Sequence, residues 1–544
     1  MKSNNFLENK YFFILFFTYF IIGNYIVSDY GISVDEEFHR YSGFYWLNYI
    51  LQFTQFDELR LAVITKLNAI NGHTLPNPSN YPFYGVTFDL PLAFFETIFE
   101  LNESRDVFLL RHYLNFFVFF LGSIFFFLIL KNRLKNQKII YLGVLLYITS
   151  PRIFGDSFYN NKDIILLSFL TINIYYFFKT IDNLNTKNTI FLSIISAFTT
   201  STRIVGIFIP IFFIFFLIIS KEKRGIKKKL RKILFFLIFF FLFLILFYPY
   251  LWANPLVNFL NLLKIFSQYP IEFEMLFNNY YINTKYLPLS YVPIWMLIST
   301  PIITLLLFFF SYLKLIQRFF KRLINIDTHN AFNDFWRGNN EKKDFFIFLS
   351  FSLILIYIIL SNTLLYNGWR HLYFLHVFII YISCLGIYRI SVILKKNNFF
   401  YIIILLGIIF SVFEIIKFHP FQGSYFNKLI YTKKKNHFEV DYWGLAGKRF
   451  FEEILSKEKK KEKINIGVAS YLPLERSLKM LNKEKYKRFV IVGQNYSDAD
   501  FIFNNNISEV NKKFDNKYAI PERFKLINEF NINGFMIYQI YQKK

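Results

Sequence analysis

Residues 233–250 read ILFFLIFFFLFLILFYPY, a stretch without a single charged side chain. A run of this length can cross a hydrocarbon core about 30 Å thick as an α-helix, because a helix satisfies its own backbone hydrogen bonds. Similar runs recur along most of the 544 residues, of which 54% are hydrophobic and 22% aromatic. The pattern predicts an α-helical polytopic membrane protein with about eleven spans. These are expected near residues 11–27, 107–130, 139–150, 163–179, 188–202, 204–220, 233–250, 291–313, 345–361, 372–392 and 399–416.

The formal net charge of +25 would indicate a nucleic-acid partner in a soluble protein. Here the Lys and Arg residues concentrate in short loops between apolar runs, so we interpret them as topology signals and expect no nucleic acid. These basic loops are residues 131–135, 221–232, 314–322 and 395–396. All fall on the side of the N-terminus, which we therefore expect in the cytoplasm. In a bacterium the protein would lie in the inner (plasma) membrane, with its C-terminal part in the periplasm.

We expect two domains, a transmembrane domain at residues 1–435 and a small soluble α/β domain at residues 436–544. The first contains a large external loop, residues 28–106, which is too long for a simple connector. In the second, hydropathy falls, and segments typical of an amphipathic helix and of several short strands follow one another. The single cysteine, Cys384, excludes an intrachain disulfide.

An acidic cluster follows the first apolar run, where Asp35, Glu36 and Glu37 occur in the sequence SVDEEFHR. Carboxylates at a membrane boundary either belong to a solvated loop or take part in chemistry on a lipid-borne substrate. Polar residues that are costly at such a boundary also stand at span ends on the same side of the membrane. They are Arg152, Lys162, Asp163, Arg203, Arg370 and His371.

A lipid phosphate is the anion that these boundary cations would meet, whereas snorkelling or pairing with Asp is the alternative for any single Arg. Carboxylates and cations at one boundary suit the transfer of a group from a phosphate-linked lipid. Asp35 or Glu36 would take a proton from the acceptor hydroxyl, and the cations would stabilise the departing phosphate. Oxygen ligands from Asp35, Glu36 and Asp89 would suit Mg²⁺ or Mn²⁺, but the sequence requires no cofactor.

Several motifs together resemble the multispanning GT-C glycosyltransferases of the protein O-mannosyltransferase and aminoarabinose-transferase type. They are the Asp35 and Glu36 pair, SPRIFGDSFYNNKD (150–163), YNGWRHLYF (366–374), HPFQGSYFN (419–427) and DYWGLAGK (441–448). The resemblance implies a GT-C-like membrane fold, a polyprenyl-phosphate-linked sugar donor, an inverting single displacement and Asp35 as the general base. Two departures from the family pattern occur. Asp156 and Asn161 replace a His and a Pro, and FDLPL around Asp89 replaces a basic or His-containing stretch.

We therefore predict a glycosyltransferase that moves one hexosyl or pentosyl unit from a polyprenyl phosphate to a cell-envelope acceptor on the non-cytoplasmic face. The acceptor would be a glycolipid, a polysaccharide or a protein hydroxyl, and membrane lipids would surround the spans. Two other classes of protein remain open. A secondary transporter or lipid flippase would carry ionisable groups near mid-span and broken helices in related halves. A non-catalytic scaffold with a periplasmic binding domain would leave Asp35 and Arg203 freely replaceable.

Overall fold

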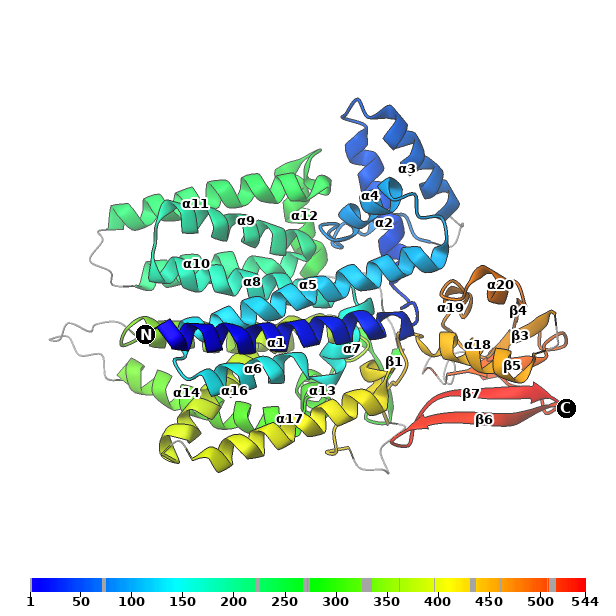
Figure 1. Cartoon of the computed structure of the whole chain (residues 1–544). Coiled ribbons are helices and arrows are strands. Elements are labelled where there is room, and N and C mark those ends of the chain that lie inside the picture. Colours follow the sequence, from blue (N-terminus) through cyan, green and yellow to red (C-terminus); the bar gives the residue numbers. More distant parts are fainter. Residues whose placement is uncertain are drawn as a thin grey trace.

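The computed structural model describes residues 2–544 except 71–74, 221–225, 268–271, 273, 325–334, 362, 396, 431–436, 460–461, 506 and 508–514. Most of the chain forms a bundle of helices that run roughly side by side, and a small sheet-containing domain lies at one end of the bundle (Figure 1). The N-terminus lies at the opposite end of the bundle from this domain (Figure 1).

Within the described residues, eight helices are long and apolar enough to cross a membrane. A ninth span is counted if α6 (Gln137–Ile148) and α7 (Pro151–Tyr159), which are bent by 59°, cross together. The chain is thus an integral, mostly helical membrane protein, as the hydropathy pattern predicts. The eight helices are α1 (Lys2–Ile26), α5 (Ser104–Arg133), α8 (Asp163–Asp182), α11 (Ile226–Phe247), α14 (Ile302–Ile324), α15 (Asn339–Leu360), α16 (His376–Ile393) and α17 (Asn398–Phe418).

The count differs from eleven because some expected spans form short or interrupted helices. The helix α9 (Thr186–Thr202) has 17 residues, and η3 (Ile204–Ile207) with α10 (Phe208–Ile219) forms another short apolar piece. The expected span 291–313 divides into α13 (Tyr291–Ser299) and α14. Pro151 stands at the break between α6 and α7, and Pro301 at the break between α13 and α14. Proline has no backbone N–H to continue the preceding helix, but it is well suited to the start of the next one.

Segment 28–106 begins with η1 (Val27–Asp29) and folds into three short helices at the end of the bundle that also carries the C-terminal domain (Figure 1). These are α2 (Glu36–Leu51), α3 (Asp57–Ile70) and α4 (Asp89–Ile98), with η2 (Pro78–Asn80) between the last two. Phe44, Leu47, Val63 and Ala93 form their shared core. A Cβ atom at Gly43 would lie 2.4 Å from the carbonyl oxygen of Asp89, so α2 and α4 approach closely here because position 43 is glycine.

Between α11 and α13 the chain stays at the same end of the bundle. It forms η4 (Pro249–Leu251), α12 (Pro255–Ser267), the antiparallel pair β1 (Glu274–Phe277) and β2 (Tyr280–Asn283), and η5 (Thr284–Tyr286). Two further single turns, η6 (Arg370–Leu375) before α16 and η7 (Gln422–Ser424) after α17, also lie among the elements that surround the site described below.

The C-terminal domain is a mixed five-stranded sheet with the strand order β4-β3-β5-β7-β6. The strand β3 pairs in parallel with β4 and β5, and β7 pairs antiparallel with β5 and β6. Phe450 and Phe451 of α18 are buried, and their rings contact Phe503 of β5 and Phe489 of β4. The elements are α18 (Ala446–Lys457), β3 (Ile464–Val468), α19 (Glu475–Leu478), α20 (Lys483–Tyr486), β4 (Phe489–Gly493), β5 (Phe501–Asn504), α22 (Asp515–Tyr518), β6 (Phe524–Ile532) and β7 (Phe535–Lys543).

This arrangement confirms the fold class, a helical membrane bundle followed by a small α/β domain. The expected domain boundary at 435/436 falls at residues outside the described part of the chain and stays a prediction. The N-terminus lies at one end of the molecule and the C-terminus at the other (Figure 1), and the predicted odd number of crossings stays a prediction. Which end faces the cytoplasm also stays a prediction, and residues 221–225 and Lys396 of the basic loops are outside the described residues.

Candidate active site

The acidic segment lies where three parts of the protein meet, namely the helical bundle, segment 28–106 and the C-terminal domain. Asp35 stands at the N-cap position of α2, and Glu36 and Glu37 form the first turn of that helix. The three neighbouring carboxylates have different partners on different elements, because consecutive positions on a helix point in different directions. Asp35 pairs with Arg370, Glu36 with His112, and Glu37 with Arg476 and Lys479.

Asp35 is the accessible carboxylate of this group. Its side chain is 35% exposed, whereas Glu36, Asp89 and Asp163 are at most 2% exposed. The Oδ2 atom of Asp35 lies 2.8 Å from Nη1 of Arg370, whose side chain is buried. Asp35 therefore contacts a buried guanidinium on one side and remains accessible on the other.

Glu36 is held inside the structure. One carboxylate oxygen lies 2.8 Å from Nε2 of His112 in α5, and the other accepts the backbone N–H of Ser33 at 2.5 Å. Both oxygens are therefore used to fix the turn that carries Asp35. Of these two carboxylates, Asp35 is the accessible one.

Asp89 and Lys162 form a buried pair beside this turn. The Lys162 Nζ atom lies 2.5 Å from Asp89 Oδ2 and donates to the carbonyl oxygen of Gly85 at the same distance. Asn161 also donates to Asp89, at 2.9 Å, and Arg111 lies 3.7 Å away. Burial lowers the pKa of Lys162, and the nearby Asp89 carboxylate opposes that effect. Lys162 thus holds α4 against the start of α8.

The arrangement does not fit a metal site. In the stretches that the structure describes, no group of three or more His, Cys, Asp or Glu side chains converges as metal ligands. Asp35, Glu36 and Asp89, the three carboxylates considered as ligands, face Arg370, His112 and Lys162 respectively. Each is paired with a different protein group, so binding a cation would require breaking these pairs.

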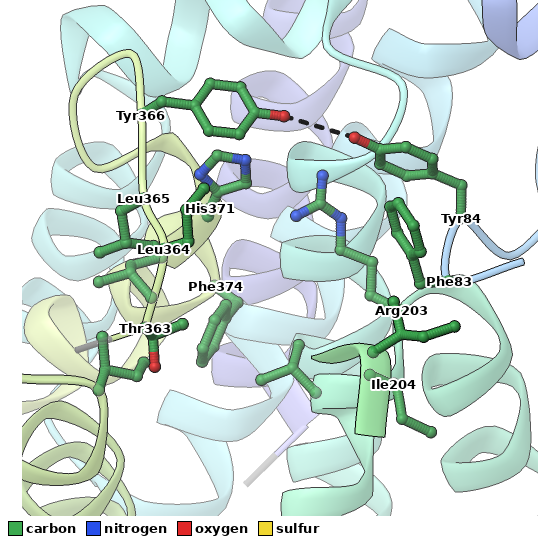
Figure 2. Close-up of a pocket in the computed structure, with 14 residues that line it drawn as sticks. Phe83, Tyr84, Arg203, Ile204, Thr363, Leu364, Leu365, Tyr366, His371 and Phe374 are labelled. Carbon is green, nitrogen blue, oxygen red and sulfur yellow. Dashed lines mark hydrogen bonds between the residues drawn. The ribbon is translucent and has the colours of Figure 1, made fainter. Parts of the chain in front are cut away.

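A cavity of about 100 Å³ opens beside Arg370, between the end of α9, the 363–374 stretch and residues 83–84. Its walls are mostly apolar, and its polar end is formed by Arg203, His371, Tyr84 and Tyr366. Figure 2 shows the Arg203 guanidinium between the His371 and Tyr84 rings, with the two tyrosine hydroxyls 3.4 Å apart. The Arg370 guanidinium lies 4.9 Å from the centre of the Tyr366 ring and so joins Asp35 to this cavity.

The polar end of the cavity holds donors that lack partners. Arg203 pairs with Asp163 at 2.9 Å through Nη2, but its buried Nε atom has no hydrogen-bond partner among the described residues. The same holds, within that part of the chain, for Nε of Arg370 and Nδ1 of His371. Buried nitrogens without partners are rare in folded proteins, and here two of the three belong to residues that line the cavity, Arg203 and His371.

His39 lies among the same cations, on the first turns of α2. Burial lowers its pKa well below the usual value, and the positive charges of Lys162, Arg203, Arg370 and Arg111 lower it further. Its ring is 5.2 Å from that of Tyr84. His39 is therefore neutral at physiological pH and contributes no charge to the site.

Arg152 stands apart from this group. It is 2% exposed, donates from Nε to the backbone carbonyl of Tyr425 at 2.8 Å, and lies over the rings of Phe426 and Trp295. Its Nη1 and Nη2 atoms have no hydrogen-bond partner within the described residues. The structure thus brings together Asp35, Arg203, Arg370 and His371, with Asp163 behind Arg203, and places Arg152 in the aromatic core.

The C-terminal domain touches the acidic segment directly. Arg476 of α19 lies 2.9 Å from Glu37 and donates to the backbone carbonyl of Val34, and Lys479 contacts Glu37 as well. The backbone N–H of Val34 donates to the carbonyl of Trp443 at 3.0 Å. We refer to Glu37, Arg476 and Lys479 as the Glu37 ion-pair cluster; it fixes both sides of Asp35.

Sequence reasoning missed this cluster and the pair Tyr84 and Tyr366. Arg476 and Val34 are separated by 442 positions, and no spacing in the sequence relates them. Tyr84 is one of 38 tyrosines, so its place at the cavity had no distinguishing signal. His39 and Arg40 stand beside the acidic cluster in the sequence, and the structure places His39 among the cations of the site and pairs Arg40 with Glu96.

Comparison with known proteins points to one family. The family described as dolichyl-phosphate-mannose-protein mannosyltransferase matches residues 94–252. Over these residues the chain is similar to that family. The match confirms the resemblance for a segment that includes Arg152, Lys162, Asp163 and Arg203, and it does not extend to Asp35 or Arg370.

A solved structure is also similar to this chain. It is the crystal structure of ArnT from Cupriavidus metallidurans bound to undecaprenyl phosphate, with 9% sequence identity and a TM-score of 0.45. The similarity covers 97% of this chain and 98% of that chain. A comparison with curated protein sequences finds no match.

Proposed function

We propose that this protein is a membrane glycosyltransferase that moves a sugar from a polyprenyl-phosphate-linked donor to an acceptor hydroxyl. The proposal rests on one observation. Arg203 and His371, each with a buried nitrogen that lacks a partner among the described residues, form the polar end of an apolar cavity, and Arg370 lies between Tyr366 of that cavity and the accessible carboxylate of Asp35. This combination suits an anion attached to a hydrocarbon chain, with a base beside it. The match of residues 94–252 to a family named for a lipid-phosphate sugar donor supports the same reading.

In the proposed reaction the acceptor oxygen attacks the anomeric carbon of the donor from the side opposite the phosphate. The bond between that carbon and the phosphate oxygen breaks, and the polyprenyl phosphate leaves with the electron pair. Asp35 takes the proton of the acceptor hydroxyl. Configuration at the anomeric carbon is inverted, because the displacement occurs once.

The cations stabilise the charge that develops on the leaving phosphate. Arg203 and Arg370 would donate charge-assisted hydrogen bonds to its oxygens, and His371 would add one from Nδ1 when that nitrogen carries the proton. Arg370 also holds Asp35 in the substrate-free protein. A phosphate that binds Arg370 would release Asp35 from this pair at the moment when the base is needed.

The remaining polar residues are proposed to position these groups. Lys162 ties Asp89 to Gly85, and Asp163 orients Arg203. Arg152, packed on Phe426 and Trp295, would support the turn at residues 366–370. We propose that transfer takes place on the non-cytoplasmic face, to a glycolipid, a polysaccharide or a protein hydroxyl.

The proposal is tested by sugar transfer in membranes that contain radiolabelled polyprenyl-phosphate sugars, with the intact protein and Asp35→Asn. General-base catalysis contributes about 10²- to 10⁴-fold, so we expect a loss of that size in the variant. Asp29→Asn is the matched control, because Asp29 is also an exposed carboxylate (49%) near the acidic segment. Equal transfer by Asp35→Asn and Asp29→Asn would exclude Asp35 as the base. Absence of transfer by the intact protein with every donor offered would exclude the proposed function.

A further inference from the structure

A second hollow is lined by residues from the last turns of α14 and α16, which lie at the end of the bundle where the N-terminus lies (Figure 1). It has a volume of about 560 Å³. Its floor includes apolar side chains such as Phe310 and Val392. Five cations line it, and we call it the basic groove. They are Lys314, Arg318, Lys321, Arg322 and Arg389.

The cations of α14 share one face of the helix. Positions 314, 318 and 321 follow the spacing i, i+4, i+7, which places side chains above one another on a helix surface. Arg389 reaches the same groove from α16. Like charges at this spacing destabilise a helix slightly, and negative charge nearby offsets that effect.

The protein supplies only part of that negative charge. Arg322 lies 3.2 Å from Glu341, and Arg318 lies 3.7 Å from Glu341 and 3.6 Å from Asp344. Asp344 is already engaged by Arg133 at 2.8 Å. Two carboxylates of α15 thus face three arginines.

The other three cations of the groove lack such partners. Lys314 contacts the side-chain oxygen of Gln317 at 3.1 Å, and Arg389 donates to the backbone carbonyl of Ser311 at 3.2 Å. Across the ranges that the structure describes, no carboxylate lies within ion-pairing distance of Lys314, Lys321 or Arg389. The groove therefore carries an excess of positive charge over an apolar floor.

We propose that the basic groove binds the phosphate headgroup of an anionic phospholipid from the surrounding bilayer. Basic pockets between membrane helices bind such headgroups at the membrane surface. The apolar floor would receive the beginning of the acyl chains. Leu313 and Phe320, which are 58% and 56% exposed on α14 beside the cations, would contact the rest of the bilayer. This site is independent of the proposed transfer reaction.

The test uses the full-length protein, delipidated in a neutral detergent, and measures binding of phosphatidylglycerol by native mass spectrometry. The variant is Lys314→Gln, Lys321→Gln and Arg389→Gln combined. Each cation near an anionic lipid contributes about 1 kcal/mol, so we expect binding to weaken on the order of 100-fold. The matched control removes three charges from the C-terminal domain, by Lys483→Gln, Lys485→Gln and Lys487→Gln, and should bind as the intact protein does.

Equal binding of phosphatidylglycerol by the intact protein and the triple variant would overturn the proposal, as would equal binding of phosphatidylcholine and phosphatidylglycerol by the intact protein. Inorganic phosphate that blocked the lipid at low millimolar concentration would identify free phosphate as the ligand instead. If the triple variant fails to fold, a salt titration of the intact protein replaces it. Lipid binding must then weaken as salt rises, because salt screens exposed charges.

Discussion

Asp35 and Glu36 are adjacent in sequence and have opposite environments. Asp35 is 35% exposed beside Arg370, whereas Glu36 is 2% exposed and bonded to His112 and Ser33. The sequence offered both as bases, because hydropathy places a residue near a membrane boundary but does not say which way its side chain points. Only the direction of the first turn of α2 separates the two roles.

His39 should make the stability of the protein depend on pH. Burial and the neighbouring cations lower its folded-state pKa, whereas an unfolded chain binds a proton at a pKa of about 6.5. Stability is therefore fully present above about pH 6.5 and falls as the pH drops below it, by up to about 1.4 kcal/mol per pH unit for one proton.

We expect His39→Gln to reduce this loss. The measurement is thermal unfolding of the two detergent-solubilised proteins between pH 7.5 and pH 5.5. The unfolding temperature of the intact protein should fall more steeply with decreasing pH than that of His39→Gln. The absolute stability of the variant does not enter the comparison. Parallel pH dependences would show that His39 takes up a proton equally well in the folded and unfolded states.

At the scale of elements, hydropathy located the helices well and their interruptions poorly. Each expected span coincides with helix, yet 139–150 continues past a 59° bend into α7, and 291–313 is cut at Pro301. Hydropathy averaged over a sequence window shows that a segment is apolar, but it does not show where the helix axis changes direction. The prolines at 151 and 301 were visible in the sequence, and only the structure shows that the bend at the first buries Arg152.

The contact between α19 and the start of α2 should control the rate of transfer. Arg476→Glu would place a negative charge against Glu37 and the turn that carries Asp35. Misplacement of a catalytic group by about 1 Å costs on the order of 100-fold, so we expect a loss of 10- to 100-fold in kcat with little change in KM.

Two further variants distinguish positioning from a general loss of structure. Combining Glu37→Arg with Arg476→Glu restores opposite charges at the Glu37 ion-pair cluster and should recover much of kcat. Lys483 lies on the same domain as Arg476 and forms an exposed pair with Glu103 of segment 28–106. Lys483→Glu should leave transfer unchanged. Equal effects of Arg476→Glu and Lys483→Glu would mean that the cluster has no influence on the site.

At the scale of the whole molecule, the site exists only where separate parts converge. The sequence predicted the membrane bundle, the small α/β domain and most of the cations at the site, because those follow from local composition. It could not predict that Arg370 would meet Asp35, 335 positions earlier, or that residues 83–84 would close the cavity. Such pairings depend on how α4, α9 and the 363–374 stretch pack together.

The cavity offers a test of this convergence. Leu364→Trp would fill much of its volume of about 100 Å³ from the apolar wall that lies across from Arg203 (Figure 2). We expect KM for the lipid-linked donor to rise at least about tenfold, a loss of about 1.4 kcal/mol of binding free energy. Leu313→Trp, the same change at an exposed position of α14, is the control. An unchanged KM in Leu364→Trp would place the lipid chain elsewhere.

The Glu37 ion-pair cluster joins residues that are synthesised at very different times. Val34 leaves the ribosome 442 residues before Arg476 does, an interval of roughly 20 to 90 s at 5–20 residues per second. Until the last domain has been made and folded, the turn that carries Asp35 lacks its contacts with Arg476, Lys479 and Trp443 and is held by the pairs that Asp35 and Glu36 make with Arg370 and His112. A nascent or prematurely terminated chain is therefore expected to occupy the membrane with this turn incompletely fixed, so that the proposed transfer activity would reach its full rate only after the C-terminal domain has been completed.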